Sequence, residues 1–299
     1  RFAVGVVTGS SVLGMLIPPS LLLILFGVLT ETSIGDLFKA GILPGILLSA
    51  AYSGLILLMA WRFPDYVGRI TDDSGRSLAI QMGLGQAIWK LTPIVLLVAL
   101  VLGGIYAGWF TPTESGAVGA LGALILALGK RQLSWVKLWQ VLTETGHVTV
   151  AILFLLIAAN IYGRMLALSG ITGFIAIWIS ESGLGLHAIL AIYLVIVLLM
   201  GTILDSTSIM MIIVPLMYPI MHDLGVNFVW FGLVTVIAIE VGLITPPLGI
   251  AAYVVKSTLD DQSITLNDVF AGAFPYVLIM IMVLLLVVIF PQISLVLVR

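Results

Sequence analysis

The chain has 299 residues, of which 61% are hydrophobic and 9% charged, with a formal net charge of −2 and a mean hydropathy of +1.26. A soluble domain is about 45–50% apolar and about 25% charged, so this composition excludes a soluble globular protein, a disordered chain and a basic surface for nucleic acid. The chain contains no cysteine, which excludes disulfide scaffolds and thiolate metal sites. The sequence therefore predicts an all-α polytopic membrane protein.

Apolar runs separated by short polar segments predict the helices, since a membrane span needs about 20 residues. The first run, 2–29, is interrupted by Pro18-Pro19, and a long span follows at 37–61. An amphipathic segment at 77–90 is expected to lie along the membrane surface. The remaining predicted segments are 92–110, 113–129, 140–168, 171–182, 186–200, 206–222, a broken run at 227–256 and a last span at 268–298.

Basic residues indicate how the spans are oriented. The loops 62–76 and 130–137 carry several Lys and Arg residues and are separated by two predicted crossings. Both loops therefore face the same side, and positive charge places that side in the cytoplasm.

An internal repeat links the two ends of the chain. Residues 14–20 (GMLIPPS) resemble 242–248 (GLITPPL), and 36–44 resemble 268–275. The arms 186–200 and 206–222 are each marginal for a span, so we expect a re-entrant hairpin that adds no net crossing. An odd number of crossings then separates the copies, and the repeats are inverted, as in many secondary transporters.

The paired prolines predict breaks in two membrane helices. A helical proline gives no N–H to the carbonyl four residues earlier, so Pro18 and Pro246 release the carbonyls of Gly14 and Gly242. At membrane depth, such backbone survives only inside protein or beside a watery cavity. Freed carbonyls, joined by the Thr245 hydroxyl, suit a hard cation such as sodium. The alternative is a plain proline kink, but two related copies favour ion sites.

The segment between the two hairpin arms is the predicted hairpin tip. Gly201 breaks the first arm, and Asp205, Ser206 and Thr207 are typical of a cap for the second. The N-terminal end of that arm would favour an anion at the midplane. Asp205 is predicted to be the buried acid, with simple capping as the alternative, and Glu240 is a similar candidate.

Three further polar residues lie close to predicted helix breaks or starts. Ser10 and Ser11, about two helical turns before Pro18, either face the cavity or bond back to their own helix. Glu114 is expected to be a helix-start residue rather than a transport acid.

The motifs at 14–20, 33–45, 110–114 and 242–249 together resemble the large membrane (M) subunit of TRAP (tripartite ATP-independent periplasmic) transporters, over essentially the whole chain. Members of this family have a further upstream stretch that includes a first hairpin with a Gly-Ser-Ser tip. We therefore expect that the chain is truncated at its N-terminus or that the upstream part is a separate piece.

This resemblance implies a sodium-coupled importer of small organic anions, such as C4-dicarboxylates, sialic acid or other sugar acids, in the bacterial inner membrane. It implies a small membrane (Q) subunit, a periplasmic substrate-binding (P) protein and an elevator motion of a transport domain. By motif, it places sodium at Gly201, Gly242, Thr245 and Leu248, and at Gly14, Ile17 and Ser20. Position alone assigns Asp205, Ser206, Thr207, Ser10 and Ser11 to the substrate.

The expected domains follow from the repeat and the resemblance. They are the trailing half of the first transport repeat at 1–30, a scaffold with arm helices at 31–182 and cytoplasmic loops at 62–90 and 130–137, the second transport repeat at 183–256 and a C-terminal scaffold helix at 257–299.

Three other functions are alternatives to an importer. A proton-coupled carboxylate carrier acting through Asp205 or Glu240 is the nearest alternative. An anion channel is disfavoured because no ring of repeated charges is present. An enzyme is not expected, because the sequence has no nucleophile–base pattern, no zinc-ligand spacing and no paired catalytic acids.

Overall fold

The computed structural model describes residues 1–67, 83–131, 133–259 and 263–298, and it is helical, with no strand among these residues. Six stretches of the described chain are long and apolar enough to cross a membrane: Phe2–Thr30, Ile34–Arg62, Ile88–Tyr106, Pro112–Gly129, Trp135–Ser169 and Leu266–Ile289. The all-α polytopic fold class predicted from composition is confirmed.

The chain divides into two compact units, and α8 (Trp135–Ser169) runs through the boundary between them at Leu155 and Leu156. The first unit holds Arg1–Val67 and Leu156–Arg299. Its other helices are α1 (Phe2–Ser11), α2 (Leu13–Leu16), α3 (Leu21–Thr30), α4 (Ile34–Arg62), α5 (Pro64–Val67), α9 (Ile171–Ser182), α10 (Leu186–Gly201), α11 (Ser206–Asp223), α12 (Phe228–Leu243), α13 (Ile250–Ser257), α14 (Leu266–Ile289) and α15 (Gln292–Leu295).

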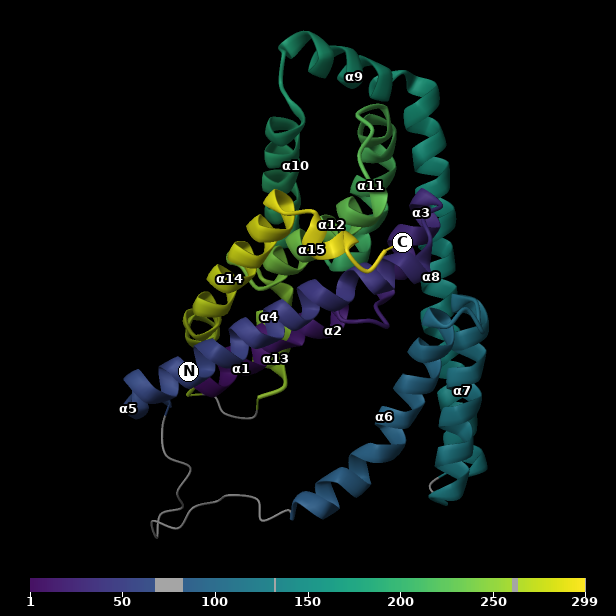
Figure 1. Cartoon of the computed structure of the whole chain (residues 1–299), viewed down its shortest axis with the longest axis vertical. Helices are drawn as coiled ribbons and strands as arrows, with labels where there is room; N and C mark the ends of the chain where they lie inside the picture. The colour runs from purple at the N-terminus through teal and green to yellow at the C-terminus, as the bar shows by residue number, and fades with distance from the viewer. Residues whose placement is uncertain (68–82, 132, 260–262, 299) are drawn as a thin grey trace. The chain divides into compact units, whose positions relative to one another are not determined.

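Helix α12 is the centre of the first unit (Figure 1). Asn227 caps it by accepting hydrogen bonds from the backbone N–H groups of Val229 and Trp230. Its sequence is apolar on all sides, as expected of a helix that is wrapped by others. It packs against α3, α4, α10 and α14, and the residues from Trp230 to Leu243 are all buried.

Two hydrogen bonds tie α12 to its neighbours. The indole N–H of Trp230 donates to the carbonyl of Val287 on α14 at 2.8 Å. On the other side, the hydroxyls of Thr235 and of Tyr193 on α10 lie 2.7 Å apart. Because these polar atoms are buried, each bond fixes the relative position of two helices.

The predicted hairpin is present. Helices α10 and α11 are joined by the short tip 202–205, and α12 follows α11 (Figure 1). Both predicted breaks are also present. Helical winding stops after Leu16 and resumes at Leu21, and it stops again after Leu243 and resumes at Ile250. The prolines of both pairs therefore lie outside helices.

The helices that follow the breaks in the two repeats also correspond in local structure. Ser33 caps α4 by accepting the N–H of Asp36, and Thr265 caps α14 by accepting the N–H of Asp268. Each helix then carries one internal proline, Pro44 in α4 and Pro275 in α14. The inverted orientation of the copies and the four predicted domains stay predictions.

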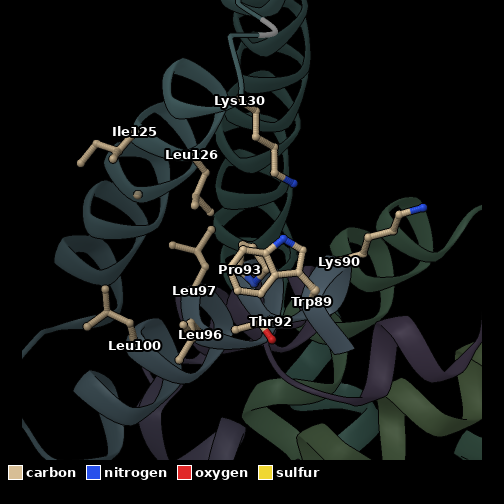
Figure 2. A pocket seen from close by; sticks show the side chains of 11 residues that line it. Trp89, Lys90, Thr92, Pro93, Leu96, Leu97, Leu100, Ile125, Leu126 and Lys130 are labelled. Carbon is tan, nitrogen blue, oxygen red and sulfur yellow. The ribbon is translucent and has the colours of Figure 1, made fainter. Parts of the chain in front are cut away.

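The second unit contains α6 (Leu84–Tyr106), α7 (Pro112–Gly129) and the first part of α8. Glu114 closes a capping box with Thr111 at the start of α7, so its predicted role at a helix start is confirmed. Between α6 and α7 lies a groove of about 800 Å³, lined mostly by apolar side chains, with Trp89, Lys90 and Lys130 on it (Figure 2).

The structure differs from the prediction of a surface segment at 77–90. Residues 77–82 lie outside the described residues, and 84–90 form the first turns of α6, continuous with the span that follows. The described part is therefore no separate interfacial helix. Pro93 lies inside α6 and does not end it, so residues 84–90 and the span that follows form one helix.

Candidate functional site

The hairpin tip meets the second helix break at two glycines. A β-carbon on Gly201 would lie 2.7 Å from the α-carbon of Gly242, and one on Gly242 would lie 2.6 Å from the α-carbon of Gly201. The ends of α10 and α12 thus touch backbone to backbone, which only glycine allows. Gly201 and Gly242, which are 41 positions apart in the numbering, are brought together as predicted for one site.

Hydrogen bonds hold the broken segment 244–249 in place. The N–H of Gly249 donates to the carbonyl of Thr202 in the hairpin tip at 3.1 Å, and the N–H of Thr245 donates to the carbonyl of Gly242 at 2.9 Å. The Thr245 hydroxyl donates to the carbonyl of Val241 at 2.6 Å. The Gly242 carbonyl, predicted to be released by Pro246, is therefore rebound by the N–H groups of Thr245 and Ile244.

The oxygen donors at this break suit a hard cation. Gly242, Thr245 and Leu248 lie along one break, and Gly201 contacts it from the hairpin. The described residues hold no group of three or more His, Asp or Glu side chains, so a cation here would be bound mainly by carbonyl and hydroxyl oxygens.

Asp205 does not have the burial that the sequence predicts. Its side chain is exposed, and it caps α11 by accepting the N–H of Ser208 at 3.0 Å and the hydroxyl of Ser208 at 2.5 Å. The prediction of a buried acid at this position is wrong, and the alternative of a helix cap is correct. The reason is local, because an N-cap side chain folds back onto its own first turn.

Glu240 is the buried acid of this region, and only 3% of it is exposed. Its carboxyl oxygen Oε1 accepts a hydrogen bond of 3.1 Å from the hydroxyl of Ser206, the first residue of α11. Thr207, next along the chain, is half-buried. The signal for Glu240 was available in the sequence, since it is the one charge in a 16-residue apolar helix.

The first break is hydrogen-bonded within its own segment and packs against α4, where a β-carbon on Gly45 would lie 2.8 Å from the side chain of Ile17. Ser20 caps α3 by accepting the N–H of Leu23, and its hydroxyl donates to the carbonyl of Met15. Ile17 is exposed at the surface of the break, and a β-carbon on Gly14 would meet no atom within 4 Å. Gly14, Ile17 and Ser20 therefore lie together on one break.

The sequence left open whether Ser10 and Ser11 face the cavity or bond back to their own helix, and the structure shows that they bond back. The Ser10 hydroxyl donates to the carbonyl of Val7 at 3.3 Å and that of Ser11 to the carbonyl of Thr8 at 2.8 Å. Both side chains bond back to α1.

Comparison with known proteins identifies the family. Residues 1–293 match the sequence profile described as "Tripartite ATP-independent periplasmic transporter, DctM component". The chain belongs to the DctM family. The resemblance to the large membrane subunit of TRAP transporters, first indicated by the proline motifs, is thus confirmed, and the spans belong to a multi-pass membrane protein.

Relatives within the DctM family carry different substrate names. The chain is 33% identical over 296 residues to the C4-dicarboxylate TRAP transporter large permease protein DctM of Pseudomonas aeruginosa, covering 98% of this chain and 66% of the relative. It is 31% identical to the sialic acid permease SiaM of Vibrio cholerae, covering 99% and 67%, and 28% identical to the 2,3-diketo-L-gulonate permease YiaN of Escherichia coli, covering 97% and 66%. The chain thus spans about two thirds of these relatives.

Proposed function

We propose that this DctM-family chain is part of the large permease subunit of a sodium-coupled importer of small organic anions in the bacterial inner membrane. One observation carries the proposal, which is the contact of the hairpin tip with the second helix break through Gly201 and Gly242. A cation held between these two segments would bind only when the tip is seated. Cation binding and tip closure are then one event.

The proposed sodium sites use backbone oxygens and two hydroxyl side chains. The second site takes Gly201, Gly242, Thr245 and Leu248, and the first takes Gly14, Ile17 and Ser20. Glycine lets the ion approach the backbone closely, and carbonyl oxygens replace its hydration shell. Leu248 contributes through its backbone, since its side chain is exposed and apolar.

The proposed anion site lies at the first turn of α11. Its free N–H groups and the positive end of the helix dipole favour a carboxylate there. Ser206 and Thr207 supply hydroxyls, and Asp205 orders the turn by capping it, whereas the hydroxyls of Ser10 and Ser11 are bonded to α1. Sodium that seats the tip would thereby raise anion affinity, with a coupling of about 1–3 kcal/mol.

The proposed partners follow from the family. They are a small membrane (Q) subunit, a periplasmic substrate-binding (P) protein that delivers the anion, and the lipid bilayer. A relative from Oleidesulfovibrio alaskensis is named isethionate TRAP transporter permease protein DctMQ. We propose that the hairpin and the two broken helices move together past the scaffold as an elevator. Substrates named for the relatives suggest a C4-dicarboxylate, sialic acid or another sugar acid.

A proton-coupled carboxylate carrier is the second candidate, and the buried carboxyl of Glu240 favours it. An intramembrane acid is a common proton carrier in transporters. An anion channel is the weaker alternative.

Uptake in proteoliposomes tests the proposal. The vesicles contain the complete permease with its small subunit, and the binding protein is supplied outside with labelled succinate or sialic acid. We expect uptake that requires an inward sodium gradient and is abolished by Gly242→Leu. Equal uptake in potassium buffer would refute sodium coupling, and uptake that follows a pH gradient instead would select the proton carrier.

A further inference from the structure

The carboxyl of Glu240 has no role in the proposed ion and anion sites. It is the one charged side chain of α12, it is buried, and it lies in the last two turns before the second break. Burying an ionisable group in a membrane protein costs several kcal/mol unless it is paired or hydrogen-bonded. A helix that is otherwise free of charge therefore accommodates this group at a stability cost.

The partner of Glu240 is the start of the second hairpin arm. The Ser206 hydroxyl donates to Oε1 of Glu240 at 3.1 Å, and Ser206 is itself buried. Ser206 is the first residue of α11, so this bond joins α12 to the start of the second arm. Asp205 serves the same turn from the solvent side, through Ser208. Two acids therefore contact this turn, and only Glu240 comes from another helix.

Glu240 and Gly242 hold opposite ends of the hairpin tip. A step of two residues along an α-helix turns the side-chain direction by about 200°. The Gly242 face meets Gly201, which precedes the tip, whereas the Glu240 side chain reaches Ser206, which follows it. Glu240 is thus directed away from the glycine contact, and the end of α12 holds the tip from both sides.

We propose that Glu240 is a positioning residue that holds the hairpin tip seated on α12 through Ser206. With this bond in place, the tip stays against the second break when the ion site is empty. Without it, the glycine contact and the bond from Gly249 to Thr202 still join the tip to the second break. The consequence for sodium affinity rests on the proposed function, whereas the effect on the tip itself does not.

A single cysteine reports the position of the tip. The 299 residues contain no cysteine, and Ile203 in the tip is 57% exposed, so Ile203→Cys introduces one reactive thiol. The complete permease is used in membrane vesicles, with any cysteine outside these residues replaced by serine. The rate of maleimide labelling is measured in potassium buffer and as a function of sodium concentration.

The following variants distinguish a positioning role of Glu240 from a general effect on the structure. In potassium buffer we expect Glu240→Ala and Ser206→Ala to label about 10-fold faster, since the buried hydrogen bond between Ser206 and Glu240 is lost. Glu240→Gln keeps an acceptor oxygen and is expected to restore most of the protection. The double variant should label no faster than Glu240→Ala, because both changes remove one bond. Glu181→Gln, at an exposed glutamate near the end of α9, is the control with no expected change.

The outcomes distinguish this inference from the sodium proposal. Unchanged labelling in Ser206→Ala, labelling of Glu240→Gln as fast as that of Glu240→Ala, or additive effects in the double variant would overturn the positioning role. If sodium fails to slow labelling of the parent protein, sodium coupling fails, while the potassium data still decide the role of Glu240. If sodium does slow it, the half-protecting sodium concentration should rise about 10-fold in Ser206→Ala. Should Glu240→Ala not accumulate, Ser206→Ala and Glu240→Gln are sufficient.

Discussion

The two helix breaks share a sequence pattern and differ in what surrounds them. At the first break, Ser20 bonds to Met15 within the same segment, and the position of a β-carbon on Gly14 is open. At the second, Gly242 touches Gly201, and Gly249 bonds to Thr202, so a separate hairpin completes the break. The proline pair thus determines where the helix stops. The segment that packs on the break differs, since α4 lies against Ile17 at the first break and the hairpin meets Gly242 itself at the second.

The largest difference between the two breaks is expected when one methyl group is added at the glycine of each, Gly242 and Gly14. In Gly242→Ala the new carbon would lie 2.6 Å from the α-carbon of Gly201 and 2.8 Å from the carbonyl oxygen of Leu198, so α10 and α12 must separate. We expect a loss of about 1–3 kcal/mol in stability. Gly14→Ala meets open space in a helical turn and should cause no loss. Thermal unfolding followed by tryptophan fluorescence measures both, and equal losses would contradict the contrast.

A second change tests the backbone conformation of the second break. Gly249 has φ +52°, and a β-carbon there would lie 2.6 Å from the ring of Phe270. Gly249→Ala should cost about 1–2 kcal/mol and loosen the bond to Thr202, because a residue with a side chain disfavours this backbone region. The matched control is Gly185→Ala, at a helix N-cap with φ −72° and open space around it. Faster labelling of Cys at position 203 is expected only for the first variant, and similar rates in both would count against it.

The smallest expected effects separate stability from ion binding. Ser20→Ala removes the cap of α3 and the bond to Met15, and should cost about 1 kcal/mol in unfolding free energy.

Thr245→Val removes one bond to Val241 and should cost about 0.5–1 kcal/mol in unfolding free energy. Its larger effect is expected on the sodium concentration that supports uptake. If Thr245→Val leaves this concentration unchanged, Thr245 is not a sodium ligand.

Local signals in the sequence predicted most of the fold. Proline pairs, glycines and apolar run lengths were enough to place the broken helices, the hairpin and the long spans, because each depends on neighbouring residues. The amphipathic segment 77–90 was the exception among the described elements, since its described residues continue directly into α6.

The burial of the acids could not be predicted from local signals. Asp205 was expected to be buried because it lies at the hairpin tip, but capping turns it toward its own helix and the surface. Glu240 is buried because other helices surround α12, and Ser206, 34 positions away in the sequence, supplies its hydrogen bond. No local pattern reports such a pair, so only the sole charge of an apolar helix pointed to it.

The length of α12 gives its burial a consequence for the membrane. Sixteen residues at about 1.5 Å each make a rod of about 24 Å, shorter than the hydrocarbon thickness of about 30 Å. A helix this short that faced acyl chains would thin the bilayer or leave its terminal carbonyls without hydrogen-bond partners. Since protein surrounds α12 on every side, it can stop winding within the hydrocarbon layer, and lipids of different thickness should act on its neighbours rather than on the break itself.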